Sequence, residues 1–262
     1  MDQAEQEEKV EEMNHSGWYS RKAYARFWPF EVVLWCVAFA SLPIYLYFGL
    51  AGMDNRHPVT RAMDSVVHIK AYQSQMQYNN YTGKYVQHFR TWQGSGCFIS
   101  RDGVILTARH VLEGAESFEI TMRDGTVLES NVSYVADNMD VGFLVVDVND
   151  ASFLRFGPDP EILDVAYILG HPFGAMNIWT VTKGIVSNID RDCNGFFGDT
   201  LMYQSDAASF PGNSGGPLLD EGGRIVGVLV GGVGGVSGIS YCIPGERAKL
   251  WADVFFMWRK AQ

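Results

Sequence analysis

Short apolar runs separated by turn-forming residues repeat along the chain from about residue 65 to residue 244. Some runs alternate apolar and polar positions, and others, such as Val104–Thr107, are almost wholly apolar. Runs of this kind bounded by Gly, Asp, Asn or Pro are typical of β-strands. The pattern therefore predicts an all-β, antiparallel barrel architecture. A first set of strands is expected at 65–71, 97–100, 104–107, 118–122, 126–129, 132–135 and 141–146, and a second set at 165–170, 178–187, 200–206, 216–220, 224–231 and 239–244.

Three further segments complete this part of the chain. Residues 72–92 are polar and rich in Gln, Asn and Tyr, which predicts a long loop or an extended hairpin. Residues 150–164 contain prolines and are expected to connect the two sets of strands. Residues 245–261 predict a C-terminal helix with one apolar face. That face is formed by Trp251, Val254, Phe255 and Trp258.

The N-terminal part of the chain has a different character. Residues 1–28 form an acidic tail followed by a basic juxtamembrane segment, and residues 32–51 contain no charged side chain. About twenty apolar residues are needed to cross the hydrocarbon core as a helix, so we expect a retained transmembrane helix at 29–51 in contact with the lipid bilayer. A polar linker is expected at 52–64. Because basic residues precede the span, the tail is expected in the cytoplasm and the following domain in the periplasm or another extracytoplasmic space.

Composition argues against several classes of partner and site. The 262 residues carry a net charge of −10 with no basic cluster after the span, which argues against a nucleic-acid partner. The four cysteines include no C-x-x-C pair, so neither a zinc nor a redox site is expected. Cys97 and Cys242 fall in apolar strands, where buried free thiols are expected.

The stretch Gly212–Gly216, Gly-Asn-Ser-Gly-Gly, is the strongest chemical signal. Glycines on both sides of a serine permit a tight turn and the close approach of a substrate carbonyl. Ser214 is therefore the candidate nucleophile. The backbone N–H groups of Gly212 and Ser214 are the candidate donors to an oxyanion.

A nucleophilic serine needs a base and a carboxylate that orients it. His110 follows a buried strand, at a position where a scaffold strand passes into a loop or short helix. Asp140 opens the apolar run Asp-Val-Gly-Phe-Leu-Val-Val and is the preferred acid, with Asp137 as its local competitor. His68 lies within a strand and His171 lies between Gly and Pro, and both are interpreted as structural.

Five segments in order carry a family resemblance: Gly94–Val111, Asp140–Val146, Leu169–Gly174, Val181–Ser187 and Gln204–Leu219. They resemble the trypsin-like serine proteases of the HtrA (Deg) type, over about Ser65 to the C-terminus. The resemblance implies two six-stranded antiparallel barrels, at about 65–150 and 164–244, with His110 and Asp140 on the first and Ser214 on the second. Two departures from the family are expected: Ala108 stands where such proteases often carry Asn, and the protease domain is expected to act without a following PDZ domain.

The resemblance also implies a function, which is cleavage of unfolded or exposed extracytoplasmic polypeptides without metal or cofactor. It places the primary specificity pocket at Ala208, and the lack of an acid there disfavours cleavage after Lys or Arg. Small or medium apolar residues before the scissile bond are expected instead. A homotrimer is common in such proteases. The alternative function is a membrane-bound binding or scaffold module with a latent triad. The strand expected to pair with substrate consists of Val228, Leu229, Val230, Gly231 and Gly232.

Overall fold

The computed structural model describes residues 54–193, 195, 197, 200–233 and 236–261. The chain divides into two compact units, Met1–Asn55 and Arg56–Gln262, and all the described helices and strands belong to the second. The predicted tail at 1–28 and membrane span at 29–51 lie outside the described residues. Among the residues that are described, no helix is long and apolar enough to cross a membrane.

The second unit begins with the short helix α4 (Pro58–Ala62), followed by the 3-10 turn η1 (Met63–Ser65). Proline suits the first turn of a helix, and the His57 side chain accepts a hydrogen bond from the Val59 amide at 3.2 Å. Val59 and Ala62 are buried against the core. The segment expected as a linker at 52–64 thus contains a helix that packs on the domain.

The first sheet contains seven strands in the order β5-β4-β1-β2-β3-β7-β6, which agrees with the seven runs expected from the pattern, whereas the resemblance implied six strands. Strands β5 and β6 are separated at Asn131, where the chain stops pairing with β4 and starts pairing with β7. The Ser130 hydroxyl donates to the Val145 carbonyl at 2.6 Å across this break. One bent segment therefore forms both edges of the sheet. The strands are β1 (Val66–Asn79), β2 (Lys84–Phe98), β3 (Val104–Thr107), β4 (Ser117–Thr121), β5 (Val127–Ser130), β6 (Val132–Val135) and β7 (Gly142–Val145).

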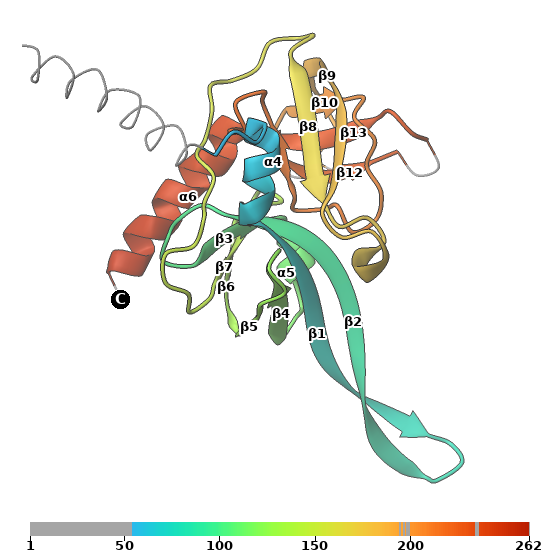
Figure 1. Cartoon of the computed structure of the whole chain (residues 1–262). Coiled ribbons are helices and arrows are strands. Elements are labelled where there is room, and N and C mark those ends of the chain that lie inside the picture. Colours follow the sequence, from blue (N-terminus) through green and yellow to red (C-terminus); the bar gives the residue numbers. More distant parts are fainter. Residues whose placement is uncertain (1–53, 194, 196, 198–199, 234–235, 262) are drawn as a thin grey trace, which may run out of the picture. The chain divides into compact units, whose positions relative to one another are not determined.

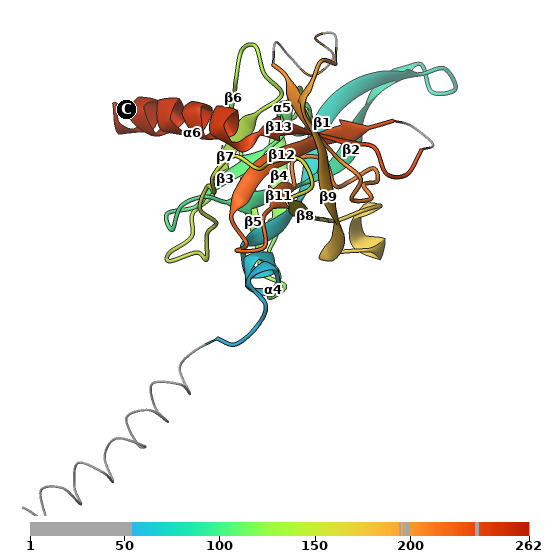
Figure 2. The ribbon, with the colours of Figure 1, turned by 90° about the horizontal axis from the view of Figure 1, so that it is seen from above.

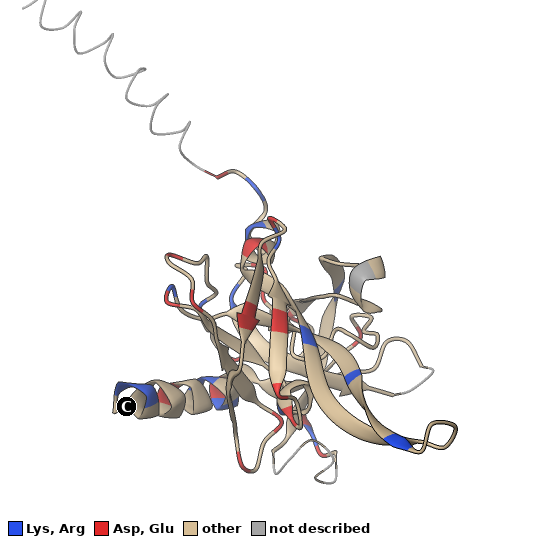
Figure 3. Ribbon diagram, turned by 90° about the horizontal axis from the view of Figure 1, so that it is seen from below, with Lys and Arg blue, Asp and Glu red and all other residues tan. Residues whose placement is uncertain are grey.

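Strands β1 and β2 continue beyond the barrel as a long hairpin, paired in unbroken register to Asn79 and Lys84 (Figure 1). The extended-hairpin alternative for 72–92 is confirmed. Because side chains alternate along a strand, Met76, Tyr78, Tyr85 and Phe89 lie on one face of this ribbon, and all four are exposed. Figure 3 shows basic but no acidic residues along these two strands.

The second sheet is a closed six-stranded barrel in the order β10-β13-β12-β11-β8-β9, as predicted (Figures 1 and 2). Its antiparallel pairing buries alternate apolar side chains around Leu218 and Ile168. A 3-10 turn, η2 (Gly174–Met176), lies between its first two strands. The strands are β8 (Val165–Gly170), β9 (Thr180–Arg191), β10 (Met202–Ser205), β11 (Pro217–Leu219), β12 (Ile225–Gly232) and β13 (Ser240–Pro244).

The C-terminal helix α6 (Gly245–Lys260) is present as predicted, but its buried face differs from the expected one. Ala248, Ala252 and Phe255 are buried, whereas 43% of Trp258 is exposed. Small residues let the helix approach the strands closely. Phe255 then stacks on Phe143 of β7, with ring centroids 5.0 Å apart and planes inclined by 11°.

Replacing Phe255 with alanine should destabilise the domain, because the change opens a cavity between α6 and the first barrel. We expect the free energy of unfolding to fall by about 3–5 kcal/mol. Chemical denaturation followed by intrinsic fluorescence measures it. Met257→Ala, on the exposed side of the same helix, is the control and should cost far less. Equal effects of the two changes would contradict this packing.

Candidate active site

His110 and Asp140 meet because their strands are neighbours. Strand β3 ends at Thr107, which lies opposite Gly142 at the start of β7. His110, in the short helix α5 (Arg109–Leu112), follows the first strand, and Asp140 precedes the second. The Asp140 carboxylate lies 2.7 Å from His110 Nδ1 and accepts the His110 backbone N–H at 2.9 Å. Its side chain is 12% exposed, against 45% for the imidazole.

The other candidate acid, Asp137, is exposed, and its backbone carbonyl accepts a hydrogen bond from Arg109. The Arg109 guanidinium donates to the carbonyls of Ala136 and Asp137 at 2.9 and 2.8 Å. It also forms an ion pair with Glu113 at 3.0 Å. Arg109 thus holds the loop that leads to Asp140. Of the two acids, the structure places Asp140 beside the histidine.

Ser214 lies in a tight turn that only glycine permits at two positions. Gly212 and Gly215 have φ values of +100° and +83°, a region that other residues rarely adopt. A Cβ on Gly215 would overlap the Thr107 hydroxyl and the Ser95 carbonyl. Within the described part of the chain, the N–H groups of Gly212 and Ser214 donate no hydrogen bond. Both donors therefore remain free for a ligand.

Strand β2 brings the two halves of the site together. The Trp92 indole donates to the carbonyl of Val111, next to His110, at 2.8 Å. Three residues further along this strand, the Ser95 amide donates to the Ser214 carbonyl of the other barrel at 2.8 Å. A Cβ on Gly94 would lie 2.6 Å from the Val111 side chain and 3.0 Å from the Ser214 carbonyl oxygen. His110 and Ser214 thus flank the same short piece of β2. Among the described residues, the two side chains form no direct hydrogen bond.

A buried polar cluster lies behind the Ser214 turn. The rings of His68 and His171 are 5.3 Å apart, and His68 Nε2 lies 3.3 Å from the Gln93 amide oxygen. His171 Nδ1 lies 3.1 Å from the Ser95 hydroxyl. Burial lowers the pKa of His171 to about 3, with a smaller contribution from the neighbouring His68. Both histidines interpreted as structural therefore sit inside the molecule, next to the site.

A groove of about 560 Å³ opens beside Ser214 and has no charged residue in its wall. Of the strand expected to pair with substrate, Leu229, Gly231 and Gly232 line the groove, while Val228 and Val230 are buried in the barrel. Ala208 is absent from the wall, and its carbonyl accepts a hydrogen bond from Thr182. The wall residues missed by sequence reasoning are Ser209, Phe210, Pro211, Val233, Val236, Ser237 and Ile239.

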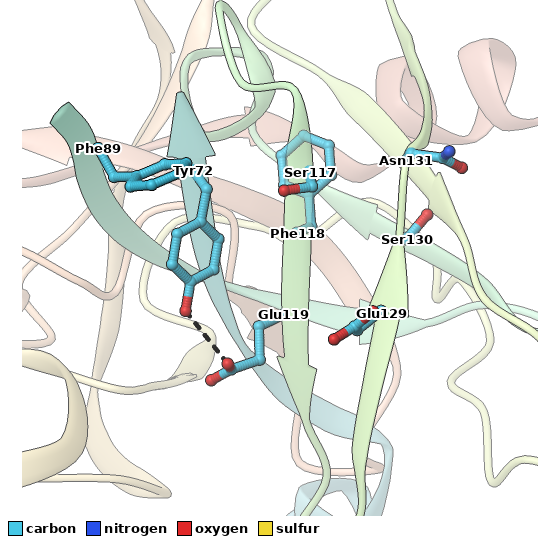
Figure 4. Close-up of a pocket in the computed structure, with 8 residues that line it drawn as sticks. All are labelled: Tyr72, Phe89, Ser117, Phe118, Glu119, Glu129, Ser130 and Asn131. Carbon is cyan, nitrogen blue, oxygen red and sulfur yellow. Dashed lines mark hydrogen bonds between the residues drawn. The ribbon is translucent and has the colours of Figure 1, made fainter. Parts of the chain in front are cut away.

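A second hollow, of about 540 Å³, lies on the first sheet where the hairpin leaves the barrel (Figure 4). Tyr72 and Phe89 form one side, and the Tyr72 hydroxyl donates to the Glu119 carboxylate at 3.1 Å. Glu129 lies directly across from Glu119 on the neighbouring strand. None of the predicted site residues lines this hollow.

The described cysteines lie apart from these groups. Cys97 and Cys242 are buried, as predicted, and burial raises the pKa of both thiols. Partial burial and the nearby Asp192 carboxylate raise the pKa of Cys193. The described cysteines are therefore held as thiols rather than thiolates at neutral pH.

Two β-barrels, with a histidine–carboxylate pair on one and a serine in a glycine turn on the other, define the trypsin-like class of fold. Residues 94–228 match the family model of the trypsin-like peptidase domain, which is more than half of the chain. The chain belongs to the trypsin-like peptidase family.

Relatives and solved structures place the domain with the HtrA-type proteases. The chain is 35% identical over 166 residues to the "probable periplasmic serine endoprotease DegP-like" of Chlamydia trachomatis, covering 62% of this chain and 33% of that one. It is 39% identical over 165 residues to the protein of the same name from Bartonella henselae, covering 60% and 32%. The chain thus spans about a third of the length of these relatives.

Two solved structures show the same fold. The structure titled "HtrA-type protease AlgW with tripeptide" is 30% identical with a TM-score of 0.62, and the match covers 73% of this chain and 60% of that one. The serine endoprotease from Yersinia pestis is 28% identical with a TM-score of 0.58, over 74% and 63% of the two chains.

The buried His171 should make stability depend on pH. The folded state keeps this imidazole neutral, whereas the unfolded chain protonates it below about pH 6.5. Because the unfolded state then binds more protons, the free energy of unfolding should fall as the pH falls from about 6.5 toward 3. Denaturant titrations at several pH values measure this slope.

His171→Asn should make the slope shallower by at most about 1.4 kcal/mol per pH unit, the value for one proton. His88→Asn, on the exposed hairpin, is the matched control. A slope that His171→Asn leaves unchanged would contradict a neutral, buried imidazole.

Proposed function

We propose that this chain is a serine endopeptidase that cleaves polypeptides through an acyl-enzyme. The observation that carries the proposal is the 2.7 Å contact between His110 Nδ1 and Asp140, beside a free serine turn. With Nδ1 engaged by the carboxylate, Nε2 is left to take the proton of the Ser214 hydroxyl as its oxygen attacks the peptide carbonyl. Asp140 fixes the tautomer and stabilises the imidazolium. His110 then donates the proton to the leaving amine, and water hydrolyses the ester.

The oxyanion of the tetrahedral intermediate would be bound by the N–H groups of Gly212 and Ser214. Support comes from the absence of any partner for these amides among the described residues. Preorganised backbone donors of this kind are worth most when they face a developing charge in a site that excludes water.

The groove beside Ser214 would bind the residue before the scissile bond. Its wall is uncharged and consists of six apolar residues, two glycines and three serines. An unpaired charged side chain would lose its hydration there, so small or medium apolar residues are preferred. Pairing of β11 with β12 ends at Val228, which leaves Gly231 and Gly232 free on that side to pair with an extended substrate.

The setting of the enzyme is also part of the proposal. The uncharged segment at 32–51 would anchor the chain in the bilayer, with the catalytic domain in the periplasm or another extracytoplasmic space. The relatives named periplasmic support that side of the membrane. Unfolded or exposed polypeptides are the proposed substrates, and a homotrimer is the proposed assembly.

One observation favours a second candidate, a binding or scaffold module with a latent triad. The hydroxyl of Ser214 forms no hydrogen bond with His110 in the described part of the chain. Catalytic hydrogen bonds are often long before substrate binds, so the enzyme remains the better-supported function.

A fluorophosphonate probe should label the membrane-extracted protein at Ser214, because the probe reacts only with an activated serine. Ser214→Ala should abolish labelling, and Asp140→Asn should slow it by about 10⁴-fold through the wrong imidazole tautomer. In-gel fluorescence and peptide mapping measure the result. An unlabelled, folded wild-type protein would contradict the peptidase and support the binding module.

Peptide substrates that differ only before the scissile bond test the groove. Val or Ala should give kcat/KM at least about 10²-fold above Lys, because the groove offers no carboxylate to a buried ammonium group. Mass spectrometry of the products confirms the cleaved bond. Equal kcat/KM for Lys and Val would contradict an uncharged pocket.

A further inference from the structure

The Ser95 hydroxyl touches the turn that carries the proposed oxyanion donors. Ser95 is fully buried near the end of β2, 117 residues before the turn. Its hydroxyl donates to the Gly212 carbonyl at 2.7 Å. The same oxygen accepts the His171 backbone N–H at 3.0 Å and lies 3.1 Å from His171 Nδ1. Neither Ser95 nor His171 has a role in the proton transfers described above.

The single hydroxyl proton fixes the roles in this cluster. The Gly212 carbonyl is an acceptor only, so the Ser95 proton is committed to it. His171 Nδ1 must then carry a proton and donate to the Ser95 oxygen, which leaves Nε2 as the bare nitrogen. Nε2 is buried and has no hydrogen-bond partner among the described residues. The ring is therefore held neutral, in agreement with the lowered pKa of His171.

Gly212 needs such support, because a glycine at φ +100° resists rotation of its two peptide planes very little. The plane before it is held by the Phe173 amide, which donates to the Pro211 carbonyl at 2.7 Å. In a trans peptide the N–H points away from the preceding carbonyl, so this bond turns the Gly212 N–H away from Phe173. The plane after Gly212 is held by Ser95. The His171 carbonyl leaves no room for a Cβ at Gly212.

We infer that Ser95 is a positioning residue for the oxyanion-binding turn: its hydroxyl holds the Gly212 carbonyl, and His171 orients that hydroxyl. The inference rests on the proposed function. Loss of the hydroxyl frees the peptide plane after Gly212. That plane links the Gly212 N–H, which the Phe173–Pro211 bond still holds, to the Ser214 N–H further along the turn. The two donors then no longer converge on the point where the oxyanion forms, while the groove that binds the ground state is untouched.

Ser95→Ala tests the inference through kcat and KM for an apolar peptide substrate, with competent sites counted by fluorophosphonate titration. Losing an oxyanion donor typically costs 10²–10³ in rate, so we expect kcat to fall by about 10²-fold. KM should stay within about threefold, because transition-state binding alone is affected. The affinity for a peptide boronic acid, whose adduct places an oxygen at the oxyanion position, should fall in parallel with kcat.

Ser130→Ala is the matched control. Its hydroxyl is also buried and also donates to a backbone carbonyl, that of Val145, in the first barrel away from the turn. This variant should lower the thermal midpoint and leave kcat unchanged. A folded Ser95→Ala protein with wild-type kcat, or with its loss wholly in KM, would overturn the inference.

If Ser95→Ala does not fold, two variants of His171 decide. His171→Asn keeps an N–H donor for the Ser95 oxygen and should hold kcat within about tenfold. His171→Leu removes that donor and should lose about as much kcat as Ser95→Ala. Equal kcat in both variants would overturn the inference. A wild-type protein that neither turns over nor labels refutes the proposed function instead, and the inference falls with it.

Discussion

The hydrogen bond from the Ser95 amide to the Ser214 carbonyl, at 2.8 Å, is the contact on which the site depends. It joins the last part of β2 in the first barrel to the serine turn of the second. Because the neighbouring Gly94 has no side chain, the Val111 side chain, next to His110, can pack close to this hydrogen bond. The relative position of His110 and Ser214 is thus set largely by backbone atoms, which are stiffer than side chains.

Two residues of the site are positioned by paired strands, and the third lies in a turn outside any strand. His110 and Asp140 follow and precede paired strands, so their geometry comes with the register of the first sheet. The serine turn belongs to no strand, and its glycines adopt backbone angles that other residues avoid. Such a turn needs outside support, which the buried Ser95 hydroxyl and the Phe173 backbone amide supply from two other segments. A neutral His171 can be buried behind the turn. A protonated His171 would need a hydrogen-bond partner for Nε2, which has none among the described residues.

Much of the fold could be predicted from sequence because local signals and the global fold agree. The strands of both barrels, the closing helix and the extended hairpin follow from apolar periodicity and turn residues. The pattern also separates the two strands on either side of Asn131. That these two strands form opposite edges of the sheet could not be predicted, since it depends on which neighbour each of them pairs with. The buried face of α6 also differed from the prediction, because large aromatic residues at its edge stay partly exposed while alanines make the close contact.

For the site, the sequence by itself determined the residue types and their order: a histidine after a strand, a carboxylate before a strand, and a serine among glycines. Only the tertiary structure decided that Asp140 rather than Asp137 meets the histidine, and that Ser209 and Phe210 rather than Ala208 line the groove. It also gave Ser95 and His171 their place behind the turn, 76 residues apart in the chain. The physical reason is that periodicity and turn chemistry act between near neighbours, whereas hydrogen bonds of buried groups join segments that only the packed barrels bring together.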